Sequence, residues 1–407
     1  MHPDITIDQA REQAGFAERL SLALLRRIAH GAITIHWPDG AIRRFRAEQS
    51  GPEAELHIHD ARLFQRMIKG GSVAVAESYM DGDWDTPDIS TLVEFGALNQ
   101  HALDLALEGR VWAQLLNRLR HVFKPNSRRG ARRNIAAHYD LGNEFYGEWL
   151  DSSLTYSSGV FESPNQSLTE SQINKYRRIA DLAGIRPGDR VLEIGCGWGG
   201  FCTWVARERK CRVDAITISE RQFAFARQRV SEQGLSDRVD IRLQDYRDVV
   251  DRYDRIVSIE MLEAVGESFW PGYFEQLKQR LKPGGRAALQ VITIADKYFA
   301  RYRRKVDFIQ KYIFPGGMLP SPATLRRLAL DAGLAWDEAA SHGPDYAQTL
   351  RIWHRRFDQA WSGIRALGFD DRFRRMWKYY LAYCEVGFDL GRIDVVQIGL
   401  NATPAKS

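Results

Sequence analysis

The sequence lacks several features that would place it in a specialised class. Its four cysteines, among 407 residues, form no Cys-x-x-Cys pair, which argues against a disulfide framework or a structural zinc site. No apolar run approaches the ~18 residues of a membrane span, and the N-terminus has no basic segment followed by an apolar core. Internal repeats and low-complexity tracts are also missing. We therefore expect a reduced, cytoplasmic protein without a secretory signal.

Positively and negatively charged residues are nearly balanced in number. Lys and Arg total 57 against 52 Asp and Glu, so the formal net charge is +5 at pH 7 and the pI is about 8.9. This balance permits attraction to anionic lipid or nucleic acid without requiring either. With 44% hydrophobic and 27% charged residues, the composition is that of a folded globular protein.

The pattern of the chain changes around a basic segment. Residues 1–118 combine alternating strands at 32–37 and 54–59 with a helical stretch at 92–119, which predicts a small N-terminal α+β domain. Residues 119–135 mix Pro, Ser and Gly with basic residues and are interpreted as an exposed linker. Residues 136–402 are expected to form the domain that carries the chemistry.

Strands and helices alternate in this larger domain. A buried strand at 190–194 is followed by strand patterns at 213–218, 239–243, 255–259 and 287–294, with helical patterns at 220–233 and 269–281 between them. Hydrophobic strands separated by helices predict an α/β fold with a doubly wound, mainly parallel sheet of the Rossmann-like type. Apolar residues at helical spacing in 350–364 and 373–384 predict helices that lie on the sheet or cover the site.

A glycine-rich turn follows the first of these strands. The segment VLEIGCGWGG (191–200) places glycine at positions 195, 197, 199 and 200 before a predicted helix. Glycine allows positive φ and close approach to a ligand, and a helix N-terminus presents free N–H groups. The spacing differs from the dinucleotide Gly-x-Gly-x-x-Gly pattern and no Walker lysine follows, so NAD and ATP fit poorly.

One histidine pair has metal-ligand spacing. His57 and His59 share a face of the predicted strand at 54–59, but no third ligand is evident nearby, and zinc normally takes at least three protein ligands. A surface or structural role is therefore expected, and no metal site is predicted.

The glycine-rich turn, as Glu-x-Gly-x-Gly-x-Gly, resembles motif I of class I S-adenosyl-L-methionine (SAM) methyltransferases. Further segments resemble cyclopropane-fatty-acyl-phospholipid synthases and the related mycolic acid cyclopropane synthases: HYDLGN (138–143), LTYSS (154–158), TIS (217–219) with Gln222, LQDYRD (243–248), MLEAVG (261–266) and YIFPGG (312–317). The resemblance runs in order through residues 134–400. It implies a class I methyltransferase fold that binds SAM.

The resemblance also implies which residues surround the cofactor. Glu193 would order the glycine turn, and Tyr246 would flank the adenine, where an aromatic face is favourable. The full set is Tyr156, Ser157, Glu193, Gly195, Cys196, Gly197, Ile218, Gln222, Asp245 and Tyr246.

In this family the base is thought to be a bound bicarbonate held by five positions. The matching residues here are Ser158, Glu263, Gln290, Ile292 and Tyr346. Ser158 stands where the family has Cys, and Gln290 where it has His. Both replacements offer hydrogen-bond donors to an oxyanion, so the resemblance still implies a bicarbonate pocket, although a proton relay through His is lost.

The implied reaction transfers the methyl carbon of SAM to the cis double bond of an unsaturated acyl chain in a membrane phospholipid. The resulting carbocation must be shielded from water, faced by aromatic rings and deprotonated by a nearby base. Loss of a proton from the new methyl group closes a cyclopropane ring, which is the expected product. Loss from a neighbouring chain carbon instead gives a methyl-branched chain, which is the alternative.

Access to lipid is predicted from residues 299–313. Five apolar residues at helical spacing alternate there with Arg301, Arg303, Arg304 and Lys305, a pattern of an interfacial helix or of an ordinary surface helix. We hypothesise that this segment contacts phospholipid, so that the protein associates peripherally with the inner face of the membrane. A homodimer is compatible with the sequence.

Two other functions fit the sequence less well. A nucleic-acid methyltransferase is disfavoured, and no nucleic-acid partner is expected, because Glu260–Glu263 differs from the Asn-Pro-Pro-Tyr type of motif that acts on base amines. A lipid-binding scaffold with a degenerate fold is disfavoured by the intact glycine-rich turn and by Glu263.

Overall fold

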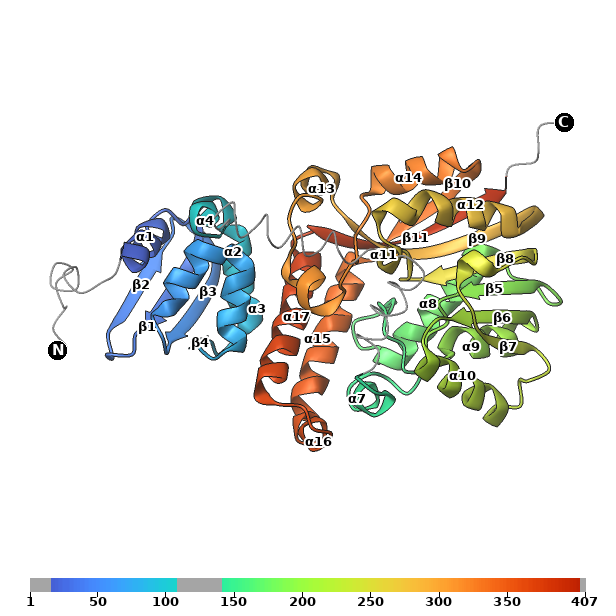
Figure 1. Cartoon of the computed structure of the whole chain (residues 1–407), viewed down its shortest axis with the longest axis horizontal. Helices are drawn as coiled ribbons and strands as arrows, with labels where there is room; N and C mark the ends of the chain where they lie inside the picture. Colours follow the sequence, from blue (N-terminus) through green and yellow to red (C-terminus); the bar gives the residue numbers. More distant parts are fainter. Residues whose placement is uncertain (1–15, 108–140, 403–407) are drawn as a thin grey trace. The chain divides into compact units, whose positions relative to one another are not determined.

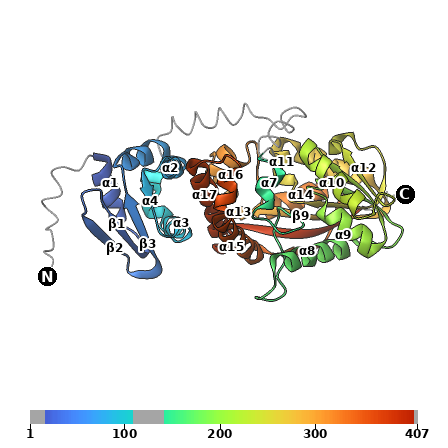
Figure 2. The same ribbon diagram turned by 90° about the horizontal axis from the view of Figure 1, so that it is seen from below.

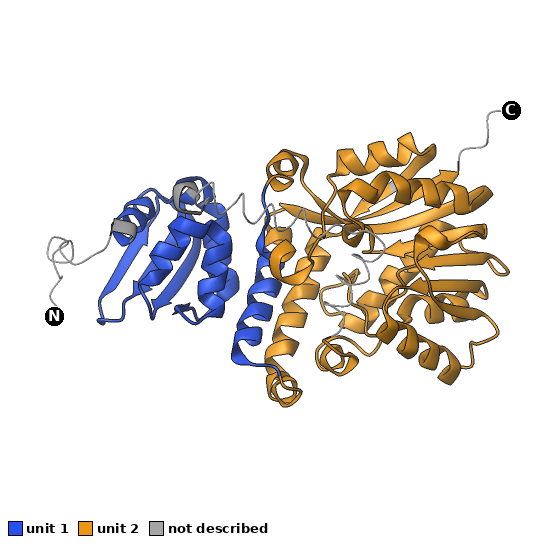
Figure 3. Ribbon diagram, in the orientation of Figure 1, with its two compact units in different colours: residues 1–120, 305–308, 369–386 blue, residues 121–304, 309–368, 387–407 orange. Residues whose placement is uncertain are grey.

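The computed structural model describes residues 16–107 and 141–402 (Figure 1). The chain divides into unit 1, residues 1–120, 305–308 and 369–386, and unit 2, residues 121–304, 309–368 and 387–407 (Figure 3). Unit 1 therefore takes two segments from the second half of the chain, which the sequence pattern did not indicate. The predicted linker lies outside the described residues, and the domain boundaries at 118 and 136 stay predictions.

Unit 1 is built on a four-stranded sheet in the order β2-β1-β3-β4. The β1–β3 pair is parallel and the two outer pairs are antiparallel. Its elements are α1 (Phe16–Leu25), β1 (His30–His36), β2 (Ile42–Arg46), β3 (Gln49–Ile58), α2 (Arg62–Met80), β4 (Trp84–Asp85), α3 (Ile89–Leu98), α4 (Gln100–Leu107) and α17 (Asp371–Asp389) through residue 386. The α+β character predicted for the N-terminal region is confirmed.

The predicted elements of unit 1 are found with shifted ends. The strands expected at 32–37 and 54–59 are β1 and β3. The helical stretch expected at 92–119 is confirmed for the described residues up to 107, where it consists of two helices, α3 and α4, separated at Asn99. Asn99 lies between them, and its side chain accepts hydrogen bonds from the Ala29 and His30 N–H groups (2.7 and 3.0 Å).

Unit 2 contains a seven-stranded sheet in the order β10-β11-β9-β8-β5-β6-β7. Strands β5 to β9 pair in parallel, and β11 is antiparallel to both of its neighbours. The strands are β5 (Arg190–Ile194), β6 (Arg212–Thr217), β7 (Val239–Leu243), β8 (Tyr253–Ile259), β9 (Leu281–Ile294), β10 (Leu334–Ser341) and β11 (Ile393–Ala402). The predicted doubly wound, mainly parallel sheet is confirmed.

Helices cover both faces of this sheet (Figures 1 and 2). Successive strand residues alternate between the two cores: Val191 packs with α8, α9 and α10, and Leu192 packs with α12 and α14. The helical elements are α7 (Asn143–Gly147), α8 (Leu168–Ala183), α9 (Gly200–Arg209), α10 (Glu220–Glu232), η2 (Tyr246–Asp248), α11 (Leu262–Val265), η3 (Glu267–Phe269), α12 (Trp270–Arg280), α13 (Asp296–Tyr302), η4 (Ile309–Ile313), α14 (Pro322–Asp331), α15 (Gly343–Gln359) and α16 (Trp361–Ala366).

Helix α8 has well-defined signals at both ends. Ser167 and Glu170 form a reciprocal capping box at its start, and Gly184 ends it with a φ of +65°. The helix is thereby fixed in register against the sheet, so that Gln172 and Lys175 are buried. Both residues belong to the candidate active site.

The continuous helix expected at 299–313 is wrong. Helix α13 ends at Tyr302, and a separate π-helical turn, η4, begins at Ile309. The Tyr302 hydroxyl accepts a hydrogen bond from the Leu319 N–H (3.3 Å), and Arg303 pairs with Glu267 (3.0 Å), so the chain is fixed at the break. None of the described helices combines the length and the hydropathy of a membrane span.

Candidate active site

The site lies at the carboxyl ends of β5 and β8. These parallel strands are neighbours, but the chain runs from β5 outward to β6 and β7 before it returns to β8. Such a reversal of strand order leaves a crevice at the carboxyl edge of the sheet, where α/β proteins bind their ligands. The glycine-rich turn follows β5, and Glu260 follows β8 directly.

The glycine-rich turn has the conformation that only glycine adopts readily. Gly195, Gly197 and Gly199 have φ values of +84°, +53° and +83°. The N–H groups of Gly195 and Cys196 both donate to the Ile216 carbonyl (3.0 Å each), which ties the turn to β6. A Cβ atom at Gly197 would meet nothing within 4 Å, so this side of the turn has space for a ligand. Burial raises the pKa of the Cys196 thiol well above its usual value.

The cofactor residues expected after β6 and β7 lie at the same edge of the sheet. Gln222 is buried on α10, and its Oε1 accepts from the Thr217 hydroxyl (2.9 Å). Ile218 is half-buried directly after β6. Asp245 is buried after β7 and forms an ion pair with Arg247 (2.6 Å). The Tyr246 ring lies edge-on to Tyr273, with centroids 5.3 Å apart.

Tyr156 belongs to a group of aromatic rings beside the turn. Its ring centroid lies 5.4 Å from Tyr146 and 5.3 Å from Trp353, and Trp353 in turn lies 6.1 Å from Tyr346. Tyr146 also contacts Trp198 of the glycine-rich turn (4.9 Å). The rings therefore connect the predicted cofactor residues with the predicted catalytic residues, and their faces favour a cation.

A fully buried lysine lies beneath Ser157. Lys175 Nζ donates to Ser157 Oγ and to Gln172 Oε1, at 2.5 Å each. Burial lowers the pKa of Lys175 to about 7, while the charges of Glu260, Asp151 and Glu193 oppose that shift. Burial also raises the pKa of Glu193 to about 8, and Glu193 Oε2 is enclosed without a hydrogen-bond partner.

Glu260 is the centre of the predicted catalytic group. Its Oε1 accepts from the Ser158 N–H (2.9 Å) and from Gln290 Nε2 (2.7 Å), and its Oε2 accepts from the Tyr346 hydroxyl (2.8 Å). Three of the five positions that the resemblance assigns to bicarbonate thus donate to a carboxylate of the chain itself. The Ser158 hydroxyl donates to the Gly159 carbonyl (2.8 Å).

Glu263 and Ile292 form a second contact of the same group. The Ile292 N–H donates to Glu263 Oε1 (2.5 Å), and Glu263 Oε2 is enclosed without a partner. Burial and the neighbouring Glu260 raise the pKa of Glu263 to about 8. Burial raises the pKa of Glu260 as well, but Lys175 and the three donors oppose that shift. With a pKa of about 8, Glu263 holds a proton at neutral pH.

Sequence reasoning brought together the right region but missed three of its residues. Glu260, Lys175 and Gln397 were not predicted, and Gln397 Nε2 donates to Gln290 Oε1 (2.9 Å). Glu260 has one signal in the sequence, because a carboxylate directly after a buried parallel strand lies at the ligand edge of the sheet. The roles assigned to the other residues stay predictions.

Comparison with known proteins places this geometry in a family. The family described as mycolic acid cyclopropane synthetase matches residues 126–398. The chain belongs to this family. It is 40% identical over 400 residues to the tuberculostearic acid methyltransferase UfaA1 of Mycobacterium tuberculosis, covering 95% of this chain and 91% of that protein. It is 35% identical over 358 residues to the cyclopropane-fatty-acyl-phospholipid synthase of Escherichia coli K12, covering 85% and 87%.

Solved structures of the family share the fold. The mycolic acid cyclopropane synthase CmaA1, solved with SAH and CTAB, aligns with a TM-score of 0.63 and 29% identity, over 66% of this chain and 98% of that one. The chain is therefore a SAM-dependent methyltransferase of this family with a class I fold. The open side of Gly197 and the enclosed carboxylate of Glu193 fit the binding of SAM.

Gly195→Ala tests the turn. A Cβ atom there would lie 2.9 Å from Met261 Cγ, and the φ of +84° is strained for alanine. We expect a loss of about 1–3 kcal/mol in the free energy of unfolding and at least a tenfold loss of SAM affinity, measured by urea unfolding and calorimetry. Gly188→Ala is the matched control, because its φ is +86° and a Cβ atom there would meet nothing within 4 Å. It should share the strain but keep the affinity for SAM, and equal losses of affinity would contradict the prediction.

Glu263→Gln tests the protonation of the buried carboxyl group. The folded protein keeps a proton on Glu263 up to a pKa of about 8, whereas the unfolded chain releases it near 4.5. The folded state therefore binds more protons between these values, and this contribution to stability is lost as the pH rises through them. Relative to the Gln variant, wild-type stability should fall by about 1 kcal/mol per pH unit from pH 5 to 8, measured by urea unfolding. Glu275→Gln, at an exposed position of α12, should leave the difference flat.

Proposed function

We propose that this methyltransferase adds the methyl carbon of SAM to the cis double bond of an unsaturated fatty acyl chain of a membrane phospholipid and closes a cyclopropane ring. The observation that carries the proposal is the half-buried Glu260 carboxylate, fixed by three donors at the carboxyl end of β8. Met261, the next residue, packs against Gly195 of the glycine-rich turn. A proton acceptor and the expected SAM site are therefore adjacent.

The residues of the chain divide the work between binding and proton transfer. SAM, when bound, supplies an electrophilic methyl group on a sulfonium. The glycine-rich turn with Glu193, Gln222, Asp245 and Tyr246 would hold it. The aromatic rings of Tyr156, Trp353 and Tyr346 exclude water and favour the positive charge that forms on the acyl chain.

Glu260 is proposed to accept the proton that leaves the methylated chain. Its carboxylate occupies the donors that the resemblance assigns to bicarbonate, and a charge-assisted hydrogen bond contributes about 1.5–3 kcal/mol. Bicarbonate would have to displace this carboxylate from Ser158, Gln290 and Tyr346. Because the Glu260 carboxylate is part of the chain, no free anion is needed at this position. A requirement for bicarbonate would therefore contradict the assignment of Glu260 as the base.

A methyl-branched product without ring closure is the second candidate. It is favoured by the 40% identity to a tuberculostearic acid methyltransferase, and by the Ser158 and Gln290 replacements. The position of the base relative to the carbocation selects which C–H bond breaks, so the two products differ only in the last proton transfer.

The acyl chain is proposed to enter beside the loop at 312–320. The Met318 N–H donates to the Glu263 carbonyl (2.9 Å), so this Gly- and Pro-containing loop lies directly against α11. Peripheral association with the inner face of the membrane and a homodimer stay predictions. Arg301, Arg303 and Arg304 remain the residues whose replacement by Glu should weaken binding to anionic vesicles.

The deciding experiment combines the purified protein, SAM labelled in its methyl group and vesicles of phospholipid with cis-unsaturated chains. Mass spectrometry of the released fatty acids should show a gain of one CH2. Resistance of the product to hydrogenation under mild conditions would identify the ring, whereas uptake of hydrogen would identify a methyl-branched or methylidene chain, because either one keeps a double bond. An unlabelled lipid fraction, with the label on another acceptor class, would overturn the proposal.

A further inference from the structure

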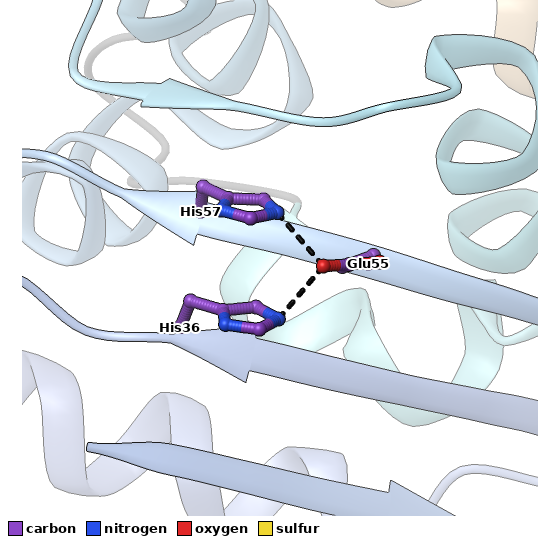
Figure 4. Close-up of side chains that lie close together, drawn as sticks. All are labelled: His36, Glu55 and His57. Carbon is purple, nitrogen blue, oxygen red and sulfur yellow. Dashed lines mark hydrogen bonds and ion pairs between the residues drawn. The ribbon is translucent and has the colours of Figure 1, made fainter. Parts of the chain in front are cut away.

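Three side chains of unit 1 converge on one point of the sheet (Figure 4). His36 of β1 and His57 of β3 are direct partners in the parallel register, and Glu55 precedes His57 by two residues. Because side chains alternate along a strand, all three project from the face opposite to Ile35 and Ile58, which are buried in the core. His36 Nε2 lies 2.8 Å and His57 Nε2 2.9 Å from Glu55 Oε1.

The two imidazole rings form a stacked pair. Their centroids lie 4.3 Å apart, their planes are inclined by 3°, and both rings direct Nε2 toward the carboxylate. Because a metal ion binds an imidazole nitrogen in the plane of the ring, one ring must rotate for both nitrogens to meet at a single ion. His36 Nε2 is shielded from solvent and is not aligned to donate a hydrogen bond to Glu55.

The distances are close to those of a zinc site. All the ligand atoms lie within 4.8 Å of one another. Metal–ligand bonds of about 2.0–2.2 Å in a tetrahedron set the ligand atoms about 3.3 Å apart, so Glu55 would withdraw by about 0.5 Å while a histidine ring rotates toward the ion. A set of two His and one carboxylate suits zinc and related borderline divalent ions.

The acidic residues next to Glu55 are already paired with arginine side chains. Glu53 pairs with Arg44 and Arg46, and Asp85, the antiparallel partner of His57, pairs with Arg375. The ion pairs of Glu55 run instead to the two histidines. The side chains of His36, His57 and Glu55 keep 30%, 38% and 42% of their surface exposed, so an ion can enter from solvent and keep a water ligand.

We propose that His36, Glu55 and His57 bind one divalent transition-metal ion, with Zn2+ as the best match. The ion would join β1 to β3 and stabilise unit 1, because it binds the folded but not the unfolded arrangement. The sequence pattern pairs His57 with His59 and offers no third ligand, whereas the proposed site joins His57 to two other residues. The missing ligands are Glu55 and a residue of the neighbouring strand. The inference does not depend on the proposed function.

The test measures metal binding by the full-length chain after dialysis against a chelator. Titration with Zn2+ should give one site per chain and raise the thermal unfolding midpoint, and Co2+ should give the intense visible bands of a tetrahedral site. His36→Ala and His57→Ala should each weaken Zn2+ binding by more than about 100-fold, since loss of a mere outer-shell partner already costs 10–100-fold. His59→Ala is the control and should leave binding unchanged.

Two further measurements keep the test decisive if a histidine variant folds poorly. They are Zn2+ binding by the Glu55→Gln variant and an X-ray absorption spectrum of the wild-type zinc complex. The spectrum should contain two imidazole ligands. Absence of saturable Zn2+ binding by the wild type, binding that survives His36→Ala, or equal loss in His59→Ala would each overturn the proposal.

Discussion

Replacing Glu260 by glycine is expected to lower the rate of methyl transfer by about 100- to 10,000-fold, the range that a positioned general base contributes. The variant should fold, because residue 260 has a φ of +49°, which glycine adopts without strain. Removal of the carboxylate leaves the Ser158 N–H, Gln290 Nε2 and the Tyr346 hydroxyl without their acceptor. These donors then form a site for a small planar anion.

Added bicarbonate should therefore restore part of the activity of Glu260→Gly, measured as labelled fatty acid formed at fixed SAM and lipid. Nitrate has a similar shape and the same charge but is a very weak base, so it should bind without restoring the rate. Glu260→Gln is the matched control, because its amide fills the space and should respond to neither anion. A wild-type enzyme that loses activity when bicarbonate is removed would contradict the role of Glu260.

Replacing Lys175 by methionine is expected to change the pH dependence of the reaction. Lys175 is the main group that opposes the raised pKa of Glu260, so its loss should raise that pKa further. The acid limb of the rate profile should move to higher pH, which lowers the rate near pH 7 and leaves it nearly normal at high pH. The measurement is the rate from pH 6 to 10 with labelled SAM.

A merely structural role for Lys175 would lower the rate equally at every pH. Arg178→Met is the control, because this cation is exposed on the same helix and should leave the profile in place. An unshifted profile in Lys175→Met, with SAM affinity intact, would contradict the electrostatic role.

The sequence predicts a strand or helix well when a few consecutive residues determine it. Strands β5 and β7 match their predicted ranges because the sequence marks each one locally, β5 by adjacent branched apolar residues and β7 by strict alternation of apolar and charged residues. Strand β11 was not predicted, although it completes the sheet next to β9, because its place depends on pairing across 100 residues of chain. Residues 369–386 likewise belong to unit 1 through packing between segments that are far apart in the sequence.

The site shows the same division. The glycine-rich turn is visible in ten consecutive residues, whereas Ser158, Gln290 and Tyr346 meet only through the fold, and a resemblance was needed to select them. Lys175 lies on a helix beside the exposed Arg177 and Arg178, and nothing in that local pattern distinguishes the buried cation from the solvated ones. Its burial is a property of the tertiary structure.

The hydrogen bond from Gln397 to Gln290 fixes more than a side-chain position. With its oxygen engaged, the Gln290 amide can present only its NH2 group to Glu260, and no change of pH can reverse that orientation. At this position, where the family resemblance implies a titratable imidazole, the chain has a permanent neutral donor. In the proposed site, changes of protonation are thereby left to the carboxyl groups and to Lys175, and β11, a strand far along the chain, sets the polarity around Glu260.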